Sequence, residues 1–183
     1  MQATEILMEE HQVIMRVLAA LEKSARRLEA GEPVQAAFFV ESADFIKGFA
    51  DGCHHKKEEG VLFPAMIEAG LPKDAGPVAV MLAEHEEGRR LTRGMRQAAE
   101  KLAQGEQAAR QEITSNAMGY VHLLRQHIQK ENYILFPMAD KIIPPDRQPQ
   151  VNADFDRIEH EETGEGVHEK YLALAERLEQ QAV

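Results

Sequence analysis

The sequence predicts an all-α fold, an antiparallel up-down four-helix bundle followed by an appended C-terminal helical segment. Three observations support this prediction. Apolar residues recur at steps of three and four over most of the chain, which is the period of a helix with one buried face. Glycine and proline interrupt the pattern at intervals of helical length. The second half of the chain also repeats a motif of the first half.

The first predicted helix begins near Thr4, which we expect to be its N-cap, and reaches about Glu29. Residues 31–33, Gly-Glu-Pro, end this helix, and the proline suits the first turn of a second helix. The second helix is predicted to extend to about Ala69.

The apolar pattern of the second helix changes phase. Its apolar positions before His54 are out of phase with those after it, and Gly48 and Gly52 lie between the two sets. Because a regular helix would turn one set toward solvent, we expect a bend or a slip in register near these glycines.

The third predicted helix covers about 78–102, with His85 on its buried stripe. The fourth covers about 113–138, where apolar residues alternate at three- and four-residue steps. The Ile-Ile-Pro-Pro run at 142–145 ends it, because proline cannot continue a helix.

A charged tail follows, and its weaker apolar pattern predicts a helix or a helical pair interrupted near Gly164 and Gly166. We expect residues 1–143 to form the bundle domain. Residues 144–183 are expected to pack on that domain as a C-terminal extension.

The repeated motif is the most informative feature of the sequence. Residues 54–64 read HHKKEEGVLFP, and residues 127–137 read HIQKENYILFP, 73 positions later. A Glu-His pair precedes each copy, at positions 10–11 and at positions 84–85. The chain is therefore interpreted as a duplicated helical hairpin with pseudo-twofold symmetry.

A histidine and a glutamate four residues apart on a helix lie ~40° apart around its axis and ~6 Å apart along it, so both can contact one point beside the helix. A single such pair is usually an ordinary surface contact. Two copies in similar apolar surroundings favour a binding site instead. The repeated positions predicted to face the bundle axis are His11, His54, Glu58, His85, His127 and Glu131.

Burying these six groups together without a partner would be costly, since two carboxylates repel each other and lose their hydration. Two divalent or trivalent cations, each with two imidazoles and sharing the carboxylates, would satisfy all six. The single cysteine, Cys53, excludes a multi-cysteine site. Nitrogen and oxygen ligation favours iron, with manganese next. We also expect each ligand helix to kink or end at its proline, Pro64 or Pro137.

As a set, these motifs resemble the hemerythrin-like family, the HHE cation-binding domain, over about residues 1–143. The resemblance implies a hemerythrin-type bundle holding two iron ions, with four histidines as terminal ligands and two bridging glutamates: His11, His54, His85, His127, Glu58 and Glu131. Oxygen-carrying members place a second histidine four residues after the one on the third helix, and here that position is Arg89. In this respect the sequence is closer to di-iron proteins implicated in nitric-oxide handling and repair of damaged iron centres.

Other candidate residues are interpreted as structural. On a regular helix His55 lies ~100° from His54, so it does not readily point at the same centre, and we place it on the surface or around the site. His122 is interpreted in the same way, His160 and His168 as structural residues of the tail, and Tyr120 either as core or as a lining of the site. Four acids are expected to lie mostly on a solvated face, from which one could orient a ligand imidazole: Glu9, Glu10, Glu84 and Glu86.

The formal charge of -10 and pI of about 5.3 disfavour nucleic acid and anionic membranes as partners. No apolar run approaches ~18 residues and the opening residues lack the pattern of a signal peptide, so a cytoplasmic location is predicted.

Three functions follow from these observations. The leading hypothesis is a non-haem di-iron protein that binds a diatomic ligand, oxygen or nitric oxide, for sensing, storage or stress response. A second is a di-iron enzyme that reduces peroxide or nitric oxide with electrons from a partner protein, or contributes to iron-centre repair. A third is a structural or interaction bundle. Catalytic turnover and a homo-oligomeric state both stay open.

Overall fold

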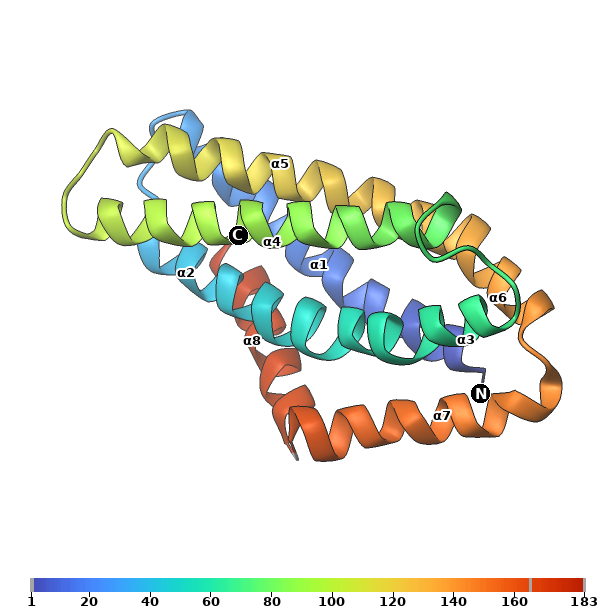
Figure 1. Cartoon of the computed structure of the whole chain (residues 1–183). Coiled ribbons are helices and arrows are strands. Elements are labelled where there is room, and N and C mark those ends of the chain that lie inside the picture. The colour runs from blue at the N-terminus through green and yellow to red at the C-terminus, as the bar shows by residue number, and fades with distance from the viewer. Residues whose placement is uncertain (1, 165, 183) are drawn as a thin grey trace.

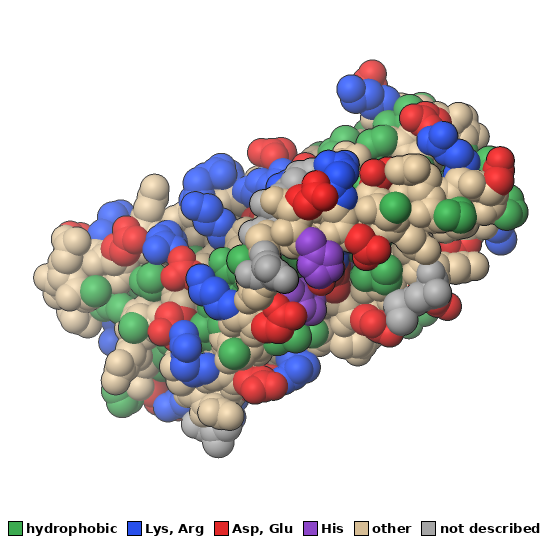
Figure 2. All heavy atoms as spheres, turned by 90° about the horizontal axis from the view of Figure 1, so that it is seen from below, with side chains coloured by type: hydrophobic (Ala, Val, Ile, Leu, Met, Phe, Trp, Pro, Cys, Tyr) green, Lys and Arg blue, Asp and Glu red, His purple; other side chains and the backbone are tan. Residues whose placement is uncertain are grey.

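The computed structural model describes residues 2–164 and 166–182, and these residues form helices joined by short loops, with no strand among them (Figure 1). The all-α prediction is confirmed, and the arrangement is consistent with a hemerythrin-type helical bundle. None of the helices within this described part is long and apolar enough to cross a membrane. On the face seen in Figure 2, acidic and basic side chains are interspersed.

Two uninterrupted helices open the two halves of the chain, α1 (Ala3–Glu29) and α4 (Gly76–Ala103). Each is followed by a composite helical run. The segments of the two runs are α2 (Ala36–Phe45), η1 (Ile46–His55), η2 (Glu58–Leu62) and α3 (Phe63–Glu68), then α5 (Ala109–Lys130), η3 (Glu131–Leu135) and α6 (Phe136–Ile142). Helix α4 packs against α5 and α2, and α1 packs against α5.

The start of α1 differs from the prediction. Its N-cap is Gln2, whose backbone N–H donates to Glu5 Oε2 over 2.8 Å. Thr4 lies inside the first turn, and its hydroxyl donates to Asp140 Oδ1 over 2.8 Å. The Thr4 side chain therefore bonds to α6 instead of capping α1.

Segment η1 is a π-helix that contains both Gly48 and Gly52 and ends at His55. A π-helix has wider turns than an α-helix, so side chains after it change phase relative to those before it. This accounts for the slip in register that the apolar pattern predicts. Gly48 has a further reason to be glycine, because a side chain there would overlap the ring of Tyr171 in the C-terminal segment.

The prolines of the repeated motif follow two further π segments, η2 and η3. The backbone N–H of Phe63 donates to the carbonyl of Glu58, five residues back, and Phe136 repeats this bond with Glu131. The prolines themselves have no N–H to donate, and they fall in the first turn of α3 and α6. Each helix therefore continues past its proline through a wide turn instead of ending there, and the alternative expectation of a kink stays a prediction.

The C-terminal segment forms the helical pair that the sequence predicts. It consists of a 3₁₀ turn, η4 (Pro145–Arg147), then α7 (Gln148–Arg157), π segment η5 (Ile158–Thr163) and α8 (Val167–Gln181). Gly164 and Gly166 both have positive φ, at 108° and 76°, and make the turn between the pair. Helix α7 lies against α1 and η2, and α8 against α1 and α2 (Figure 1). The division into a bundle domain and an extension stays a prediction.

The core consists of two apolar clusters separated by a polar layer. On α1, Leu7 belongs to one cluster and Ile14 to the other, and buried His11 lies between them. The same order recurs on α4, where His85 lies between Met81 and Leu91. In both composite runs, the apolar residues before the histidine and glutamate of the motif belong to one cluster, and those after them belong to the other. Every helical run of the repeat thus contributes polar groups at the same level.

Candidate metal centre

The structure brings the six predicted site residues together in this layer. Each is at most 2% exposed. Ligand atoms of His11, His54, Glu58 and Glu131 lie within 4.8 Å of one another, and Glu58 shares a second such group with His85 and His127. The layer therefore contains two adjoining groups of donors, joined by a glutamate.

Both glutamates reach across the two halves of the chain. One oxygen of Glu58 is 3.6 Å from Nε2 of His54, and the other is 3.4 Å from Nε2 of His85. One oxygen of Glu131 is 3.2 Å from Nε2 of His11, and the other is 3.0 Å from Nε2 of His127. Each carboxylate thus presents one oxygen to each group, which is the arrangement of a carboxylate that bridges two cations.

Several of these donor atoms have no hydrogen-bond partner within the described part of the chain. They are Nε2 of His11 and His54 and both oxygens of Glu58 and Glu131. Buried polar atoms left without partners are rare and costly. More than four converging nitrogen and oxygen donors exceed what structural zinc uses and suit iron or manganese. The residues present therefore fit a pair of such ions.

The other ring nitrogen of each histidine is held from outside the layer. Nδ1 of His54 contacts Glu10 over 2.9 Å, and Nδ1 of His127 contacts Glu84 over 2.8 Å. Nδ1 of His85 contacts Glu59 over 2.7 Å. In the same way, Nδ1 of His11 contacts Asn132 Oδ1 over 2.8 Å. An N–H donated at Nδ1 leaves the Nε2 lone pair directed inward, as a metal ligand requires.

Two of the acids interpreted as solvated are among these outer partners. Glu10 is only 5% exposed, and Glu84 is partly buried. The expectation that one acid could orient an imidazole is therefore confirmed for the glutamate of each Glu-His pair. Each of them holds the histidine of the following composite run rather than its own neighbour in sequence.

The remaining positions of the motif also contact the layer. Lys57 donates to Glu10 over 2.5 Å, and Lys130 pairs with Glu84 in the corresponding place. The phenylalanines stack on histidines of the opposite half, Phe63 on His85 and Phe136 on His11, with ring centroids 5.9 and 5.5 Å apart. The motif therefore supplies the donors, clamps their outer partners and covers them with rings.

Charges within the layer shift its pKa values strongly. Burial alone would lower the pKa of His127, but the charge of nearby Glu131 raises it to about 10. Burial alone would raise the pKa of Glu131, but the charges of nearby His127 and His11 lower it. Burial opposes the charged form of His54 and His85 too, yet nearby Glu58 raises the pKa of both. A cation would have to displace protons from these rings, so binding should strengthen as pH rises.

Sequence reasoning placed His55 on the surface or around the site, and the surface placement is wrong. The side chain is 3% exposed, and its ring stacks on that of His85 with centroids 3.9 Å apart. Its ligand atom belongs to the group of Glu58, His85 and His127. The angle of ~100° from His54 assumed a regular α-helix, whereas η1 is π-helical up to this residue. The change of phase in the apolar pattern near Gly52 was the signal in the sequence that could have indicated this direction of His55.

The other secondary candidates lie outside both groups. His122 and His160 are exposed, and His168 packs partly buried against Phe49. Cys53 is a buried core residue, and burial together with the charge of Glu10 raises the pKa of its thiol to about 12. Tyr120 is 1% exposed and belongs to the apolar core.

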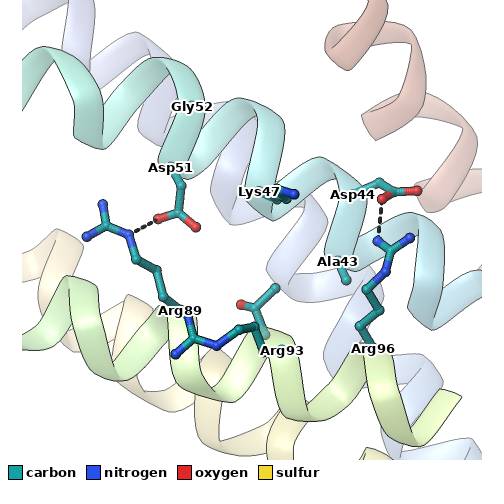
Figure 3. Close-up of a pocket in the computed structure, with 9 residues that line it drawn as sticks. Ala43, Asp44, Lys47, Asp51, Gly52, Arg89, Arg93 and Arg96 are labelled. Carbon is teal, nitrogen blue, oxygen red and sulfur yellow. Dashed lines mark hydrogen bonds and ion pairs between the residues drawn. The ribbon is translucent and has the colours of Figure 1, made fainter. Parts of the chain in front are cut away.

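A cavity of about 650 Å³ lies between α4 and the run formed by α2 and η1 (Figure 3). Arg89 and Asp51 meet on its wall, with Arg89 Nε 3.5 Å from an Asp51 oxygen. Arg89 also donates to Glu59 over 2.7 Å, and Glu59 in turn holds His85. Arg89, at the position where oxygen-carrying hemerythrins have a histidine, therefore contacts outer partners of the layer.

Comparisons with known proteins agree with this geometry. The model of the hemerythrin HHE cation binding domain matches residues 2–139. Uncharacterized proteins of Mycobacterium tuberculosis and Mycobacterium bovis are 29% identical to the chain over 163 residues, 89% of this chain and 63% of theirs. The iron-sulfur cluster repair protein YtfE of Salmonella newport is 35% identical over 92 residues, 47% of this chain and 40% of that protein.

The chain thus spans less than two thirds of the length of these curated relatives. No solved structure matches it. The domain match covers most of the chain and includes every histidine and glutamate of the buried layer, so the chain belongs to the hemerythrin HHE cation-binding domain family.

Proposed function

We propose that this protein is a non-haem di-iron protein whose centre binds a diatomic ligand, oxygen or nitric oxide, for sensing, storage or stress response. The observation that carries the proposal is the position of Glu58 and Glu131, each with one oxygen beside a histidine of each half. Two imidazoles and two carboxylate oxygens per ion amount to four donors. Iron commonly takes more than four, so positions stay open for solvent or a small ligand.

Two bound iron ions would supply Lewis acidity, open coordination positions and reducing equivalents. The protein's own residues then have three tasks. Glu10, Glu59, Glu84 and Asn132 hold the imidazoles in orientation. The stacked phenylalanines and the two apolar clusters limit the access of water. The short loop between α4 and α5, which pack together, favours the antiparallel up-down order of a hemerythrin-type bundle. In that order, the donor residues of the two halves of the chain would lie at the same height along the bundle.

The test is reconstitution of the metal-free protein with ferrous iron in the absence of oxygen, followed by metal analysis and titration with nitric oxide or oxygen. We expect about two irons per chain and an optical change that saturates with the gas. His54→Ala should lower iron uptake, whereas His122→Ala, at an exposed position, should not. Iron uptake well below one per chain, with no gas-dependent spectrum, would refute the proposal and leave the structural bundle.

A role in the repair of iron centres is the second candidate, and the relationship to the iron-sulfur cluster repair protein YtfE favours it. It requires reaction with a damaged iron-sulfur protein, or turnover of nitric oxide or peroxide with electrons from a reductant. Assays of the iron-loaded protein with each substrate would separate this candidate from simple binding. Oxidation limited to one equivalent of the centre would exclude turnover.

A further inference from the structure

The ring of His55 is placed as a donor rather than as packing. Its Nε2 is buried and has no hydrogen-bond partner in the described residues, as is also true of Nε2 of His11 and His54. The same ring belongs to the group of donor atoms within 4.8 Å of one another that includes Glu58, His85 and His127. An unsatisfied nitrogen at this depth points to a ligand within reach.

The outer contact of His55 follows the pattern of the other four rings. Its Nδ1 lies 2.9 Å from an oxygen of Asp51, just as the outer nitrogens of His54, His85 and His127 contact carboxylates. Asp51 is itself paired with Arg89 on the cavity wall. Outer support of this kind orients a ring and keeps the inner nitrogen free to bind metal.

The other half of the chain shows what packing alone would use at this place. In the repeat, Ile128 corresponds to His55 and Leu124 corresponds to Asp51. Both are buried apolar residues of the larger cluster. If His55 only filled space, an apolar side chain would do so without burying an unpaired nitrogen.

We propose that His55 is a fifth imidazole ligand, so that the centre is asymmetric, with His55, His85 and His127 on one ion and His11 and His54 on the other. This inference rests on the proposed di-iron function. Arg89 contacts the outer carboxylates of His55 and His85, and so supports the ion that has three imidazoles. The third imidazole of this ion therefore comes from the end of π segment η1, in the first composite run.

The test compares wild-type protein with His55→Ile, which copies the residue of the other half, and with the exposed-site control His122→Ile. Each is loaded with ⁵⁷Fe(II), and Mössbauer spectra are recorded. We expect two distinct doublets of equal area for the wild type and the control. His55→Ile should give doublets that converge, or should lose the iron bound by His85 and His127.

A second variant guards against a folding defect. His55→Gly should be rescued by added imidazole, which can enter from the adjacent cavity and restore the two doublets. If His55 served only in packing, added imidazole would restore the stability of the variant but not the two doublets. Two bound irons with an unchanged His55→Ile spectrum would overturn the fifth ligand and leave the di-iron function standing. Failure of the wild type to take up iron would overturn both.

Discussion

The two copies of the repeated motif build the same contacts in different surroundings. In the first copy Lys57 is fully buried and bonds both Glu10 and, over 2.8 Å, Glu159 of the C-terminal segment. In the second copy Lys130 makes the corresponding pair with Glu84, but its side chain is 36% exposed. The repeat thus specifies which side chains contact one another, whereas the elements packed around each copy determine how exposed those side chains are to solvent.

The same contrast holds in the wide turns. Val61 of the first copy is 7% exposed and belongs to the apolar cluster that also includes Val151 and Phe155 of α7. Its counterpart Ile134 in the second copy is 55% exposed. The C-terminal segment therefore covers the wide turn beside one half of the centre, whereas the wide turn beside the other half, here called the solvent-facing half, is exposed. We expect substitutions in the covered half to have the larger effects, except where a residue serves both halves.

The largest effect is expected at a residue shared by both halves. Glu131→Gln removes a carboxylate whose two oxygens lie beside His11 and His127, so both irons should be lost together. The stabilisation that iron gives, about 4 kcal/mol at a thousandfold excess over Kd, should disappear. Metal analysis and thermal unfolding with and without iron measure this. Glu9→Gln, at an exposed position, is the control. A variant that retained one tightly bound iron would show that Glu131 serves a single ion.

The lysines provide the direct comparison between the halves. Lys57→Ala leaves the buried carboxylate of Glu10 with His54 as its remaining charged partner, which should cost about 1.5–3 kcal/mol of unfolding free energy. Lys130→Ala removes a partly exposed pair and should cost only about 0.2–1 kcal/mol. Urea unfolding of the two metal-free variants gives both values. Equal losses would show that burial by the C-terminal segment does not distinguish the halves.

Acid should destabilise the metal-free protein through the covered half. Burial alone would raise the pKa of Glu10, but hydrogen bonding and charge from His54 and Lys57 lower it from 4.5 to about 2. Because the folded-state pKa is depressed, this stabilisation is complete above the unfolded value and is lost as pH falls from 4.5 to 2. The loss should reach about 3 kcal/mol, since each pKa unit corresponds to about 1.4 kcal/mol.

Urea unfolding of chelator-treated protein across this pH range tests the expectation. In Glu10→Gln the free energy of unfolding should change less between pH 4.5 and 2 than in the wild type. A variant with the same acid dependence as the wild type would assign that dependence to other carboxylates.

The pKa of His127, raised to about 10 chiefly by Glu131 against the effect of burial, affects stability at high pH instead. Its contribution is complete below 6.5 and is lost as pH rises through 10.

The six residues of the candidate site could be predicted from the sequence because the motif that contains them occurs twice at helical spacing. His54 with Glu58 and His127 with Glu131 need only the geometry of one helix, and the repeat brings in His11 and His85. The helices themselves follow from the apolar period and from the glycine and proline breaks. Local information was sufficient for these features.

The outer partners could not be predicted in this way, because they depend on which helices pack together. Glu10 holds His54 rather than neighbouring His11, and Asn132 holds His11 from another run. His55 was misplaced for a different reason. Its direction depends on the π-helical turns of η1, and the apolar pattern indicated only that some slip occurs there.

The smallest expected effect tests whether the C-terminal segment acts on the centre through Lys57. Glu159 lies on η5, and its side chain is 28% exposed. Glu159→Gln removes one ion pair of Lys57 and leaves the other, with Glu10, in place, so stability should fall by at most about 1 kcal/mol. The chain of contacts from Glu159 through Lys57 and Glu10 ends at His54.

The Mössbauer doublet of the iron beside His54 should therefore shift, while the other doublet stays in place. Glu161→Gln, at an exposed position of the same segment, is the matched control and should shift neither. A shift of both doublets to the same extent, or of neither, would show that the segment covers this half of the centre without tuning it. A selective shift would mean that the covered half differs from the solvent-facing half in electrostatics as well as in packing.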